Sequence, residues 1–421
     1  MRGLKRLFQI ILEEGFYGVY FKLIGKVKSR ILSKLMKEGK WEKAIRTGET
    51  LLSIFPDNMY YPLKVAECYQ NINKDGQAYK IIQNYFDLNF NLNDVFEISE
   101  KQFSDQNLIK SKYLYLGGSN NEGLIEHRLI NNKYLTKITQ SEHKEVEKLF
   151  YSKIYKLYPE IKKVTPKFMG ITQIKEHNLS LITMQKVEGM GLKLNDKVIH
   201  EVGKISKIIS SITYGEIYKW FPSNIVKSGS EIHKLLWSFD SIHREHKNKE
   251  LFMTLYNKME QLNYLSESIL LIERVETIIM EKKMYEKLQP MKHYSVQHGD
   301  FFYKNLLSED NKIYVVDWGC MKIGPSWCDM AGFLGEIRQP FNKIHSNFLL
   351  NEKVTGHFEP IEKLFFIYTL ITVWISEFSK KEFNNSLELY LRPAVELIEE
   401  IAKEIEIDKH KSNVKRQLNT M

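Results

Sequence analysis

Cysteine, long apolar runs and a recognisable leader are scarce or missing in this sequence, and each absence excludes a class of protein. The three cysteines, Cys68, Cys320 and Cys328, are too few and too scattered for a disulfide framework or a zinc site. No run of about eighteen apolar residues occurs, so we expect no transmembrane helix. Glu13 and Glu14 interrupt the apolar stretch that a signal peptide would need. We therefore expect a cytoplasmic protein.

Disorder is also excluded for most of the chain. Hydrophobic residues make up 43% of the 421 residues, aromatic residues 12%, and only ten residues are proline. This composition is typical of a globular protein, and the length suits two or three domains.

Positive charge is concentrated at the N-terminus. Residues 1–40 contain ten lysines and arginines against three acids, a net charge of +7, whereas the whole chain carries +9. The remainder is nearly neutral, and we expect no nucleic-acid partner. A solvated helix face explains the basic segment most simply, and a peripheral contact with anionic lipid is the alternative.

The first hundred residues have the pattern of paired helices. A helix is predicted over residues 4–35, and Ala44 and Ala78 follow in two similar segments, 34 residues apart, which is the period of a tetratricopeptide repeat. Chance periodicity in ordinary helical hairpins is the alternative. Two repeats rarely stand alone, so we expect this region to lean on the N-terminal helix or on the following domain. A protein partner could also bind its grooves.

From residue 111 the pattern changes to short strands. We predict strands at Lys112–Leu116, Leu124–Ile130 and Tyr134–Ile138, and another from Leu179 that ends at Gly189. Between the first two, the loop Gly117–Gly123 could bring backbone N–H groups close to phosphates, or could be a simple hairpin turn.

The most informative stretch runs from His298 to Trp318. It reads H-G-D-x-x-x-x-N, with Asp300 and Asn305 five positions apart, and a predicted strand then ends at Asp317. Phosphoryl transfer needs one carboxylate facing an acceptor hydroxyl, and hard oxygen ligands for Mg²⁺. Asp300 suits the first role, and Asn305 and Asp317 suit the second. Taken singly, these residues could be ordinary turn formers.

Together, these residues resemble the catalytic segment of the aminoglycoside phosphotransferase and choline kinase family, which has a protein-kinase-like fold. Gly324–Ala331 resembles a further family segment, although Pro325 follows Gly324 directly. For that reason we expect Asp329 to support the loop rather than to touch substrate. The resemblance implies an α+β, two-lobed kinase-like fold preceded by an α-helical repeat region. The implied domains are residues 1–105 (helical), 106–189 (N-lobe and hinge) and 190–421 (helical C-lobe).

The resemblance also implies residues that bind the nucleotide. Lys137 would contact the phosphates, with Lys133 as the alternative, and Glu145 would pair with that lysine, with Glu142 and Glu147 as competitors. The other implied nucleotide contacts are Gly118 and Ser119 in the loop, and Gln185 and Val187 at the hinge.

The predicted reaction moves the γ-phosphate of ATP or GTP, with Mg²⁺, to a hydroxyl of a small molecule. An aminoglycoside, a choline-like amino alcohol and a sugar are all compatible acceptors, because residues 195–290 contain acids, tryptophan and tyrosine. A catalytically silent scaffold is the alternative, although it would have no chemical need for Asp300, Asn305 and Asp317. Protein-kinase activity is disfavoured because H-G-D lacks the arginine of H-R-D.

Overall fold

The structure is a computed structural model of the chain that describes residues 24–56, 58, 60–86, 90–114, 123–140, 145–223, 245–350, 358–378 and 386–419. The chain forms two compact units. One contains Met1–Lys144 and Phe168–Lys186, and the other contains Glu145–Lys167 and Val187–Met421. These boundaries differ from the predicted division into three domains, which stays a proposal.

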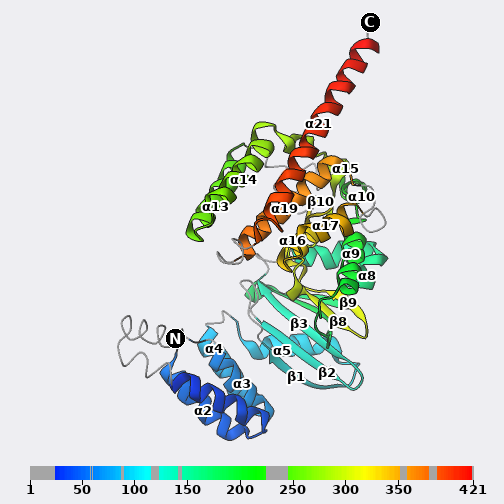
Figure 1. Cartoon of the computed structure of the whole chain (residues 1–421). Helices are drawn as coiled ribbons and strands as arrows, with labels where there is room; N and C mark the ends of the chain where they lie inside the picture. Colours follow the sequence, from blue (N-terminus) through cyan, green and yellow to red (C-terminus); the bar gives the residue numbers. More distant parts are fainter. Residues whose placement is uncertain are drawn as a thin grey trace. The chain divides into compact units, whose positions relative to one another are not determined.

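The first unit begins with helices. A helix over residues 24–37 is followed by α2 (Trp41–Ile54), α3 (Tyr60–Asn71), α4 (Asp75–Phe86) and α5 (Leu92–Glu100) (Figure 1). Ala44 and Ala78 are each the fourth residue of their helices, α2 and α4, and both are fully buried. The 34-residue spacing therefore joins equivalent helix positions. The assignment to tetratricopeptide repeats remains a proposal.

An antiparallel sheet of five strands completes the first unit, with the spatial order β1-β2-β3-β5-β4. The strands are β1 (Leu108–Leu114), β2 (Gly123–Leu129), β3 (Lys133–Gln140), β4 (Phe168–Ile174) and β5 (Leu179–Gln185). Every residue of β5 except the last is buried, so both faces of this strand are covered. In β2, by contrast, buried positions alternate with more exposed ones, as in a strand with one covered face.

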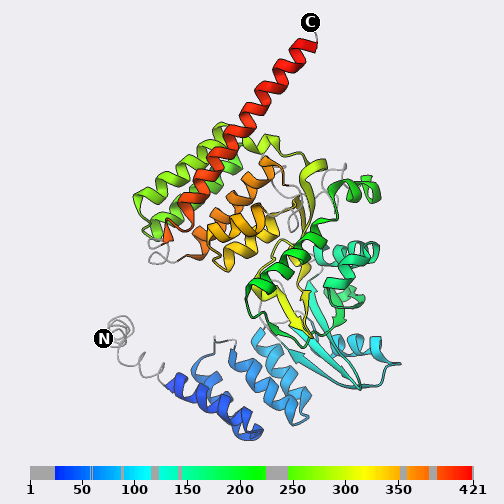
Figure 2. The same ribbon diagram turned by 45° about the vertical axis from the view of Figure 1, so that its right-hand side comes forward.

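Helices α4 and α5 lie beside the sheet (Figure 2), and the helices and the sheet share one hydrophobic core. Ile82 and Phe96 from the helices cluster with Ile125, Ile138 and Leu181 from three strands. A second cluster joins the helix over residues 24–37 to α2 and α3 through Leu32, Leu51 and Val65. The helical region therefore leans both on its first helix and on the sheet, as expected. The predicted boundary at residues 105 and 106 does not separate two cores.

The second unit is mainly helical and has two small sheets, β10-β7 and β6-β8-β9. Its strands are β6 (Met190–Gly191), β7 (Tyr294–Gln297), β8 (Leu306–Glu309), β9 (Lys312–Val315) and β10 (Lys322–Pro325). Its first helical segments are α6 (Glu145–Leu149), the π-helical turn η2 (Phe150–Ile154), α7 (Tyr155–Leu157), α8 (Pro159–Val164), α9 (Asp196–Ser210) and α10 (Tyr214–Trp220).

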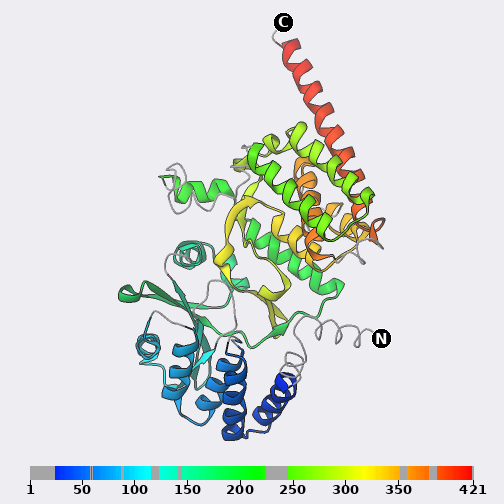
Figure 3. The same ribbon diagram turned by 90° about the vertical axis from the view of Figure 1, so that its left-hand side faces the viewer.

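Later helices form a bundle in the same unit, in which α13, α14, α19 and α21 lie side by side (Figure 3). They are α13 (Glu245–Gln261), α14 (Ser266–Glu276), α15 (Pro290–His293), α16 (Cys328–Glu336), α17 (Phe341–Ile344), α19 (Pro360–Glu377) and α21 (Leu391–Asn419). Local sequence sets the helix starts: Asn195 caps α9, and Glu359 with Glu362 forms a capping box before Pro360.

These elements confirm the predicted α+β class and the order of an N-terminal helical region, a sheet and a mainly helical part. Among the described helices, none combines the length and the apolar character that crossing a membrane requires.

Candidate functional site

The H-G-D turn follows β7 directly, and its glycine is required by the backbone. Gly299 has a φ of +81°, and a Cβ at this position would lie 2.0 Å from the carbonyl oxygen of Cys320. Both facts exclude a side chain, because L-residues avoid this φ and the obstructing atom belongs to the main chain. Glycine therefore lets the catalytic segment pass close to the turn that follows Asp317.

The buried carboxylate of Asp329 holds the same turn through hydrogen bonds to its backbone. Asp329 at the start of α16 accepts hydrogen bonds from the backbone N–H groups of His298 (2.6 Å) and Gly299 (2.9 Å). Burial raises the pKa of Asp329, and these two hydrogen bonds oppose the shift. Asp329 thus supports the loop, as the sequence predicts.

His298 links the turn to the strand before Asp317. Its Nε2 donates to the carbonyl oxygen of Val316 at 3.0 Å, and its Nδ1 accepts from the N–H of Asp300 at 3.3 Å. This pattern fits the neutral ring, and complete burial lowers the pKa of His298. His298 therefore supports the loop through these two hydrogen bonds rather than carrying a proton.

Asp300 and Asn305 are brought together as the spacing predicts. The Nδ2 of Asn305 donates both to the backbone oxygen of Asp300 (2.8 Å) and to its Oδ2 (2.9 Å). The Nζ of Lys304 lies 3.0 Å from the same Oδ2. Oδ2 is therefore engaged by two donors, which fixes the carboxylate and leaves its Oδ1 edge for an acceptor hydroxyl.

Asp317 occupies a strained turn beside this pair. Its φ of +64° and ψ of +64° place a non-glycine residue in the left-handed region, which is costly and recurs at functional sites. The N–H of Val316 bonds to the oxygen of Asn305 at 3.0 Å, so the two strand ends are joined. The ring of Trp318 then stacks on Phe150 of η2, with centroids 3.9 Å apart.

One site residue has no sequence signature. Glu336, at the end of α16, accepts the backbone N–H of Tyr303 at 2.6 Å. Burial raises the pKa of Glu336, and the negative charges of Glu377 and Asp300 act in the same direction. Because 33 positions separate Glu336 from Tyr303, no local spacing could reveal the contact. Lys304, four positions after Asp300, could have been found from its spacing.

The remaining predicted residues divide between the two units. Lys137 lies on β3 with a side chain 5% exposed, and Gln185 ends β5, both in the first unit. Val187 belongs to the second unit. Gly118, Ser119 and the side chain of Glu145 lie outside the described residues.

Glu147, a competitor of Glu145 in the sequence, is fully buried on α6. Burial raises the pKa of Tyr151 well above its ordinary value, with smaller effects from the charges of Glu147 and Asp317. Glu147 and Asp317 therefore both lie within electrostatic reach of Tyr151. Helix α6 thus carries a buried carboxylate toward the Asp317 turn.

The donor set of the loop fits Mg²⁺. Among the described residues, no group of three or more His, Cys, Asp or Glu could hold a metal ion. Mg²⁺ needs fewer, since it keeps several waters and takes one or two protein oxygens. The Nδ2 of Asn305 is committed to Asp300, so its amide oxygen is free to act as a ligand together with the carboxylate of Asp317.

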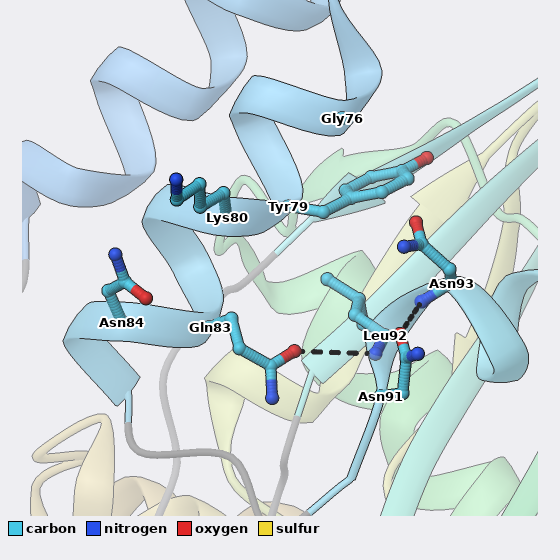
Figure 4. A pocket seen from close by; sticks show the side chains of 8 residues that line it. All are labelled: Gly76, Tyr79, Lys80, Gln83, Asn84, Asn91, Leu92 and Asn93. Carbon is cyan, nitrogen blue, oxygen red and sulfur yellow. Dashed lines mark hydrogen bonds between the residues drawn. The ribbon is translucent and has the colours of Figure 1, made fainter.

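A separate open groove of about 410 Å³ lies between α4 and the start of α5 (Figure 4). Two of its amides serve the fold. Gln83 donates to the oxygen of Phe90 and accepts from the N–H of Leu92, and Asn91 caps α5. The groove contains none of the predicted catalytic residues.

Residues 233–347 match the model of the phosphotransferase enzyme family. This segment contains the whole stretch from His298 to Asp329, so the predicted resemblance is confirmed. No curated protein matches the chain.

Several solved structures resemble this one at low identity. A spectinomycin phosphotransferase with ADP and spectinomycin is 15% identical, covering 73% of this chain and 96% of that one, with a TM-score of 0.38. An amicoumacin kinase with AMP-PNP and Ca²⁺ is 12% identical, covering 76% and 94%, with a TM-score of 0.43. The choline kinase of Streptococcus pneumoniae is 15% identical, covering 73% and 99%, with a TM-score of 0.39.

Proposed function

We propose that this protein transfers the γ-phosphate of ATP or GTP to a hydroxyl of a small molecule. The observation that carries the proposal is the fixed carboxylate of Asp300, held by Asn305 beside the strained turn of Asp317. Such an arrangement suits a reaction that depends on positioning and electrostatics more than on covalent chemistry.

In this mechanism the acceptor oxygen attacks the γ-phosphorus and the bond to the β–γ bridging oxygen breaks. The hydroxyl proton passes to Asp300, and the nucleoside diphosphate leaves with the bonding electrons. Asn305 fixes the direction of the Asp300 carboxylate through Oδ2, so that Oδ1 meets the hydroxyl. Glu336 holds the loop through the N–H of Tyr303.

Asn305 and Asp317 would hold Mg²⁺, which supplies positive charge that neutralises the nucleotide phosphates. Lys137 would contact the phosphates, Gly118 and Ser119 would offer backbone N–H groups, and Gln185 with Val187 would meet the base. The glutamate that pairs with the lysine would be Glu145, with Glu142 and Glu147 as the alternatives.

The candidate acceptors are an aminoglycoside, a choline-like amino alcohol and a sugar. Glu336 lies within electrostatic reach of Asp300, and Glu377 lies within electrostatic reach of Glu336. This charge supports an acceptor that carries an amine over a neutral sugar, since a cation would be attracted to the carboxylates.

Replacement of Asp300 by alanine tests the proposal. With a metabolite library as acceptor, Asp300→Ala should cut turnover by on the order of 10²–10⁴ and leave nucleotide binding largely intact, because it removes a positioned base. Near-normal turnover in the purified variant would rule out the assigned role. A wild type that binds nucleotide but phosphorylates no acceptor would support the alternative of a catalytically silent scaffold.

We also propose that the N-terminal helix brings the enzyme to an anionic membrane surface. On the helix over residues 24–37, Lys26, Arg30 and Lys34 are exposed beside Val27 (49%) and Ile31 (44%). Basic residues contribute about 1 kcal/mol each near such a surface, and the two apolar side chains would enter the interface. Sedimentation with vesicles should require anionic lipid, and should fail for Arg30→Glu/Lys34→Glu.

A protein partner at the helical repeats is a further proposal. The α4–α5 groove, with Lys80, Asn84 and Asn93 on its walls, is the candidate place for a polar peptide. Cross-linking from Asn84→Cys in cells should capture a partner there. Capture at equal yield from an exposed cysteine on α13 (Met253→Cys) would remove the support for this groove.

A further inference from the structure

The ammonium of Lys304 lies against the proposed catalytic carboxylate. Its Nζ is 3.0 Å from Oδ2 of Asp300, and its side chain is 65% exposed. The hydrogen bond to Asp300 raises the pKa of Lys304, and the charge of Asp317 acts in the same direction. The ammonium is therefore within electrostatic reach of both the proposed base and a proposed metal ligand.

Folding does not explain this position well. An exposed ion pair contributes little to stability, because water screens it and two long side chains must be ordered. Lys304 and Asp300 also do not belong to a helix that the pair could support, since η6 spans only Tyr303–Asn305. A use in the reaction is the better explanation for a lysine held here.

The negative charges around Asp300 explain what Lys304 would do in the reaction. Asp300 pairs with Lys304, and Asp317 and Glu336 both lie within electrostatic reach of Lys304. A γ-phosphate that arrives beside them adds further negative charge, and the repulsion would oppose both its binding and its approach to Asp300. A cation that contacts the proposed base, within electrostatic reach of the proposed metal ligand, offsets this repulsion where the charge develops.

We propose that Lys304 contacts a non-bridging oxygen of the γ-phosphate and stabilises that group during its transfer. This inference rests on the proposed function. An ammonium has three N–H donors, so Lys304 can keep its hydrogen bond to Asp300 with one donor and bind a phosphate oxygen with another. In the transfer, the acceptor oxygen bonds to phosphorus, the bridging P–O bond breaks, the proton goes to Asp300, and Lys304 keeps its proton throughout.

Nucleotide affinity tests this role without knowledge of the acceptor. We would measure the Kd of Mg²⁺–AMP-PNP and of Mg²⁺–ADP for the wild type, Lys304→Met and Lys304→Arg. The matched control is Lys163→Met, because Lys163 is 64% exposed and pairs with Glu160 at 2.7 Å three positions away. Lys304→Met should bind AMP-PNP about tenfold more weakly, a loss of about 1.4 kcal/mol.

The same variant should bind ADP within twofold of wild type, which also shows that it has folded, and Lys304→Arg should keep most of the AMP-PNP affinity. Lys163→Met should change neither the affinity for AMP-PNP nor the affinity for ADP. An unchanged ratio of the two affinities in Lys304→Met would overturn the proposal and leave the phosphotransferase assignment standing. A wild type that binds neither nucleotide would overturn both.

Discussion

The glycine of the H-G-D turn should be irreplaceable, and the structure gives the size of the penalty. In Gly299→Ala the new Cβ would lie 2.0 Å from the oxygen and 2.9 Å from the carbon of the Cys320 carbonyl. A non-glycine residue at a φ of +81° costs about 1–2 kcal/mol. The backbone shift would also stretch the 2.9 Å bond to Asp329, whose loss costs about 1.5–3 kcal/mol.

Together these losses amount to about 3–5 kcal/mol, enough to displace Asp300 or to lower the melting temperature by on the order of 10 °C. The control is Gly332→Ala on α16, where a Cβ would meet Phe302 only at an ordinary 3.7 Å. That change should be neutral or stabilise the helix by up to about 1 kcal/mol. Thermal melting and nucleotide turnover of both variants measure the difference. If Gly299→Ala melts and reacts like the wild type, the steric reasoning is wrong.

Three other perturbations follow from particular contacts. Asp317→Asn should remove most of the gain in nucleotide affinity that Mg²⁺ provides, because it neutralises a hard ligand; titrations with and without the metal decide, and a surviving gain would exclude Asp317 as a ligand. Burial lowers the pKa of His127 to about 4 from 6.5, so stability should fall by about 3 kcal/mol as the pH drops from 6.5 to 4, since only the unfolded chain takes up the proton. Urea unfolding at several pH values in that range should show that the stability of His127→Gln depends less steeply on pH than that of the wild type. Equal dependence on pH in both proteins would argue against the lowered pKa of His127. A chain that begins near Phe103 should aggregate rather than bind nucleotide, because the cluster containing Phe96, Ile125 and Leu181 loses its helical half; a monodisperse product that binds nucleotide would show that the sheet folds alone.

The helices and strands were predictable from their own periodicities, but the core that joins them was not. Packing between Phe96 and Ile125 depends on contacts across 29 positions, for which no local pattern exists. Strand β4 was also missed, because Gly170 weakens its local strand signal and the pairing with β5 is not visible in the sequence.

At the site, predictability followed sequence distance. Asp300 and Asn305 are five positions apart and one hairpin leads from them to Asp317, so their spacing in the sequence suggested all three. The complete burial of Glu147 on α6, two positions after Glu145, was not predicted from the sequence. Glu336 reaches the loop only through the fold.

The most direct test of the phosphotransferase assignment is a turnover screen with Mg²⁺ and γ-labelled ATP or GTP against hydroxyl-bearing metabolites, run in parallel for the wild type and Asp300→Ala. We expect at least one acceptor, with an amine preferred, to gain a labelled phosphate in the wild type only. Phosphate transfer at equal rates in both proteins, or a wild type that shows neither transfer nor Mg²⁺-dependent nucleotide binding, would contradict the assignment.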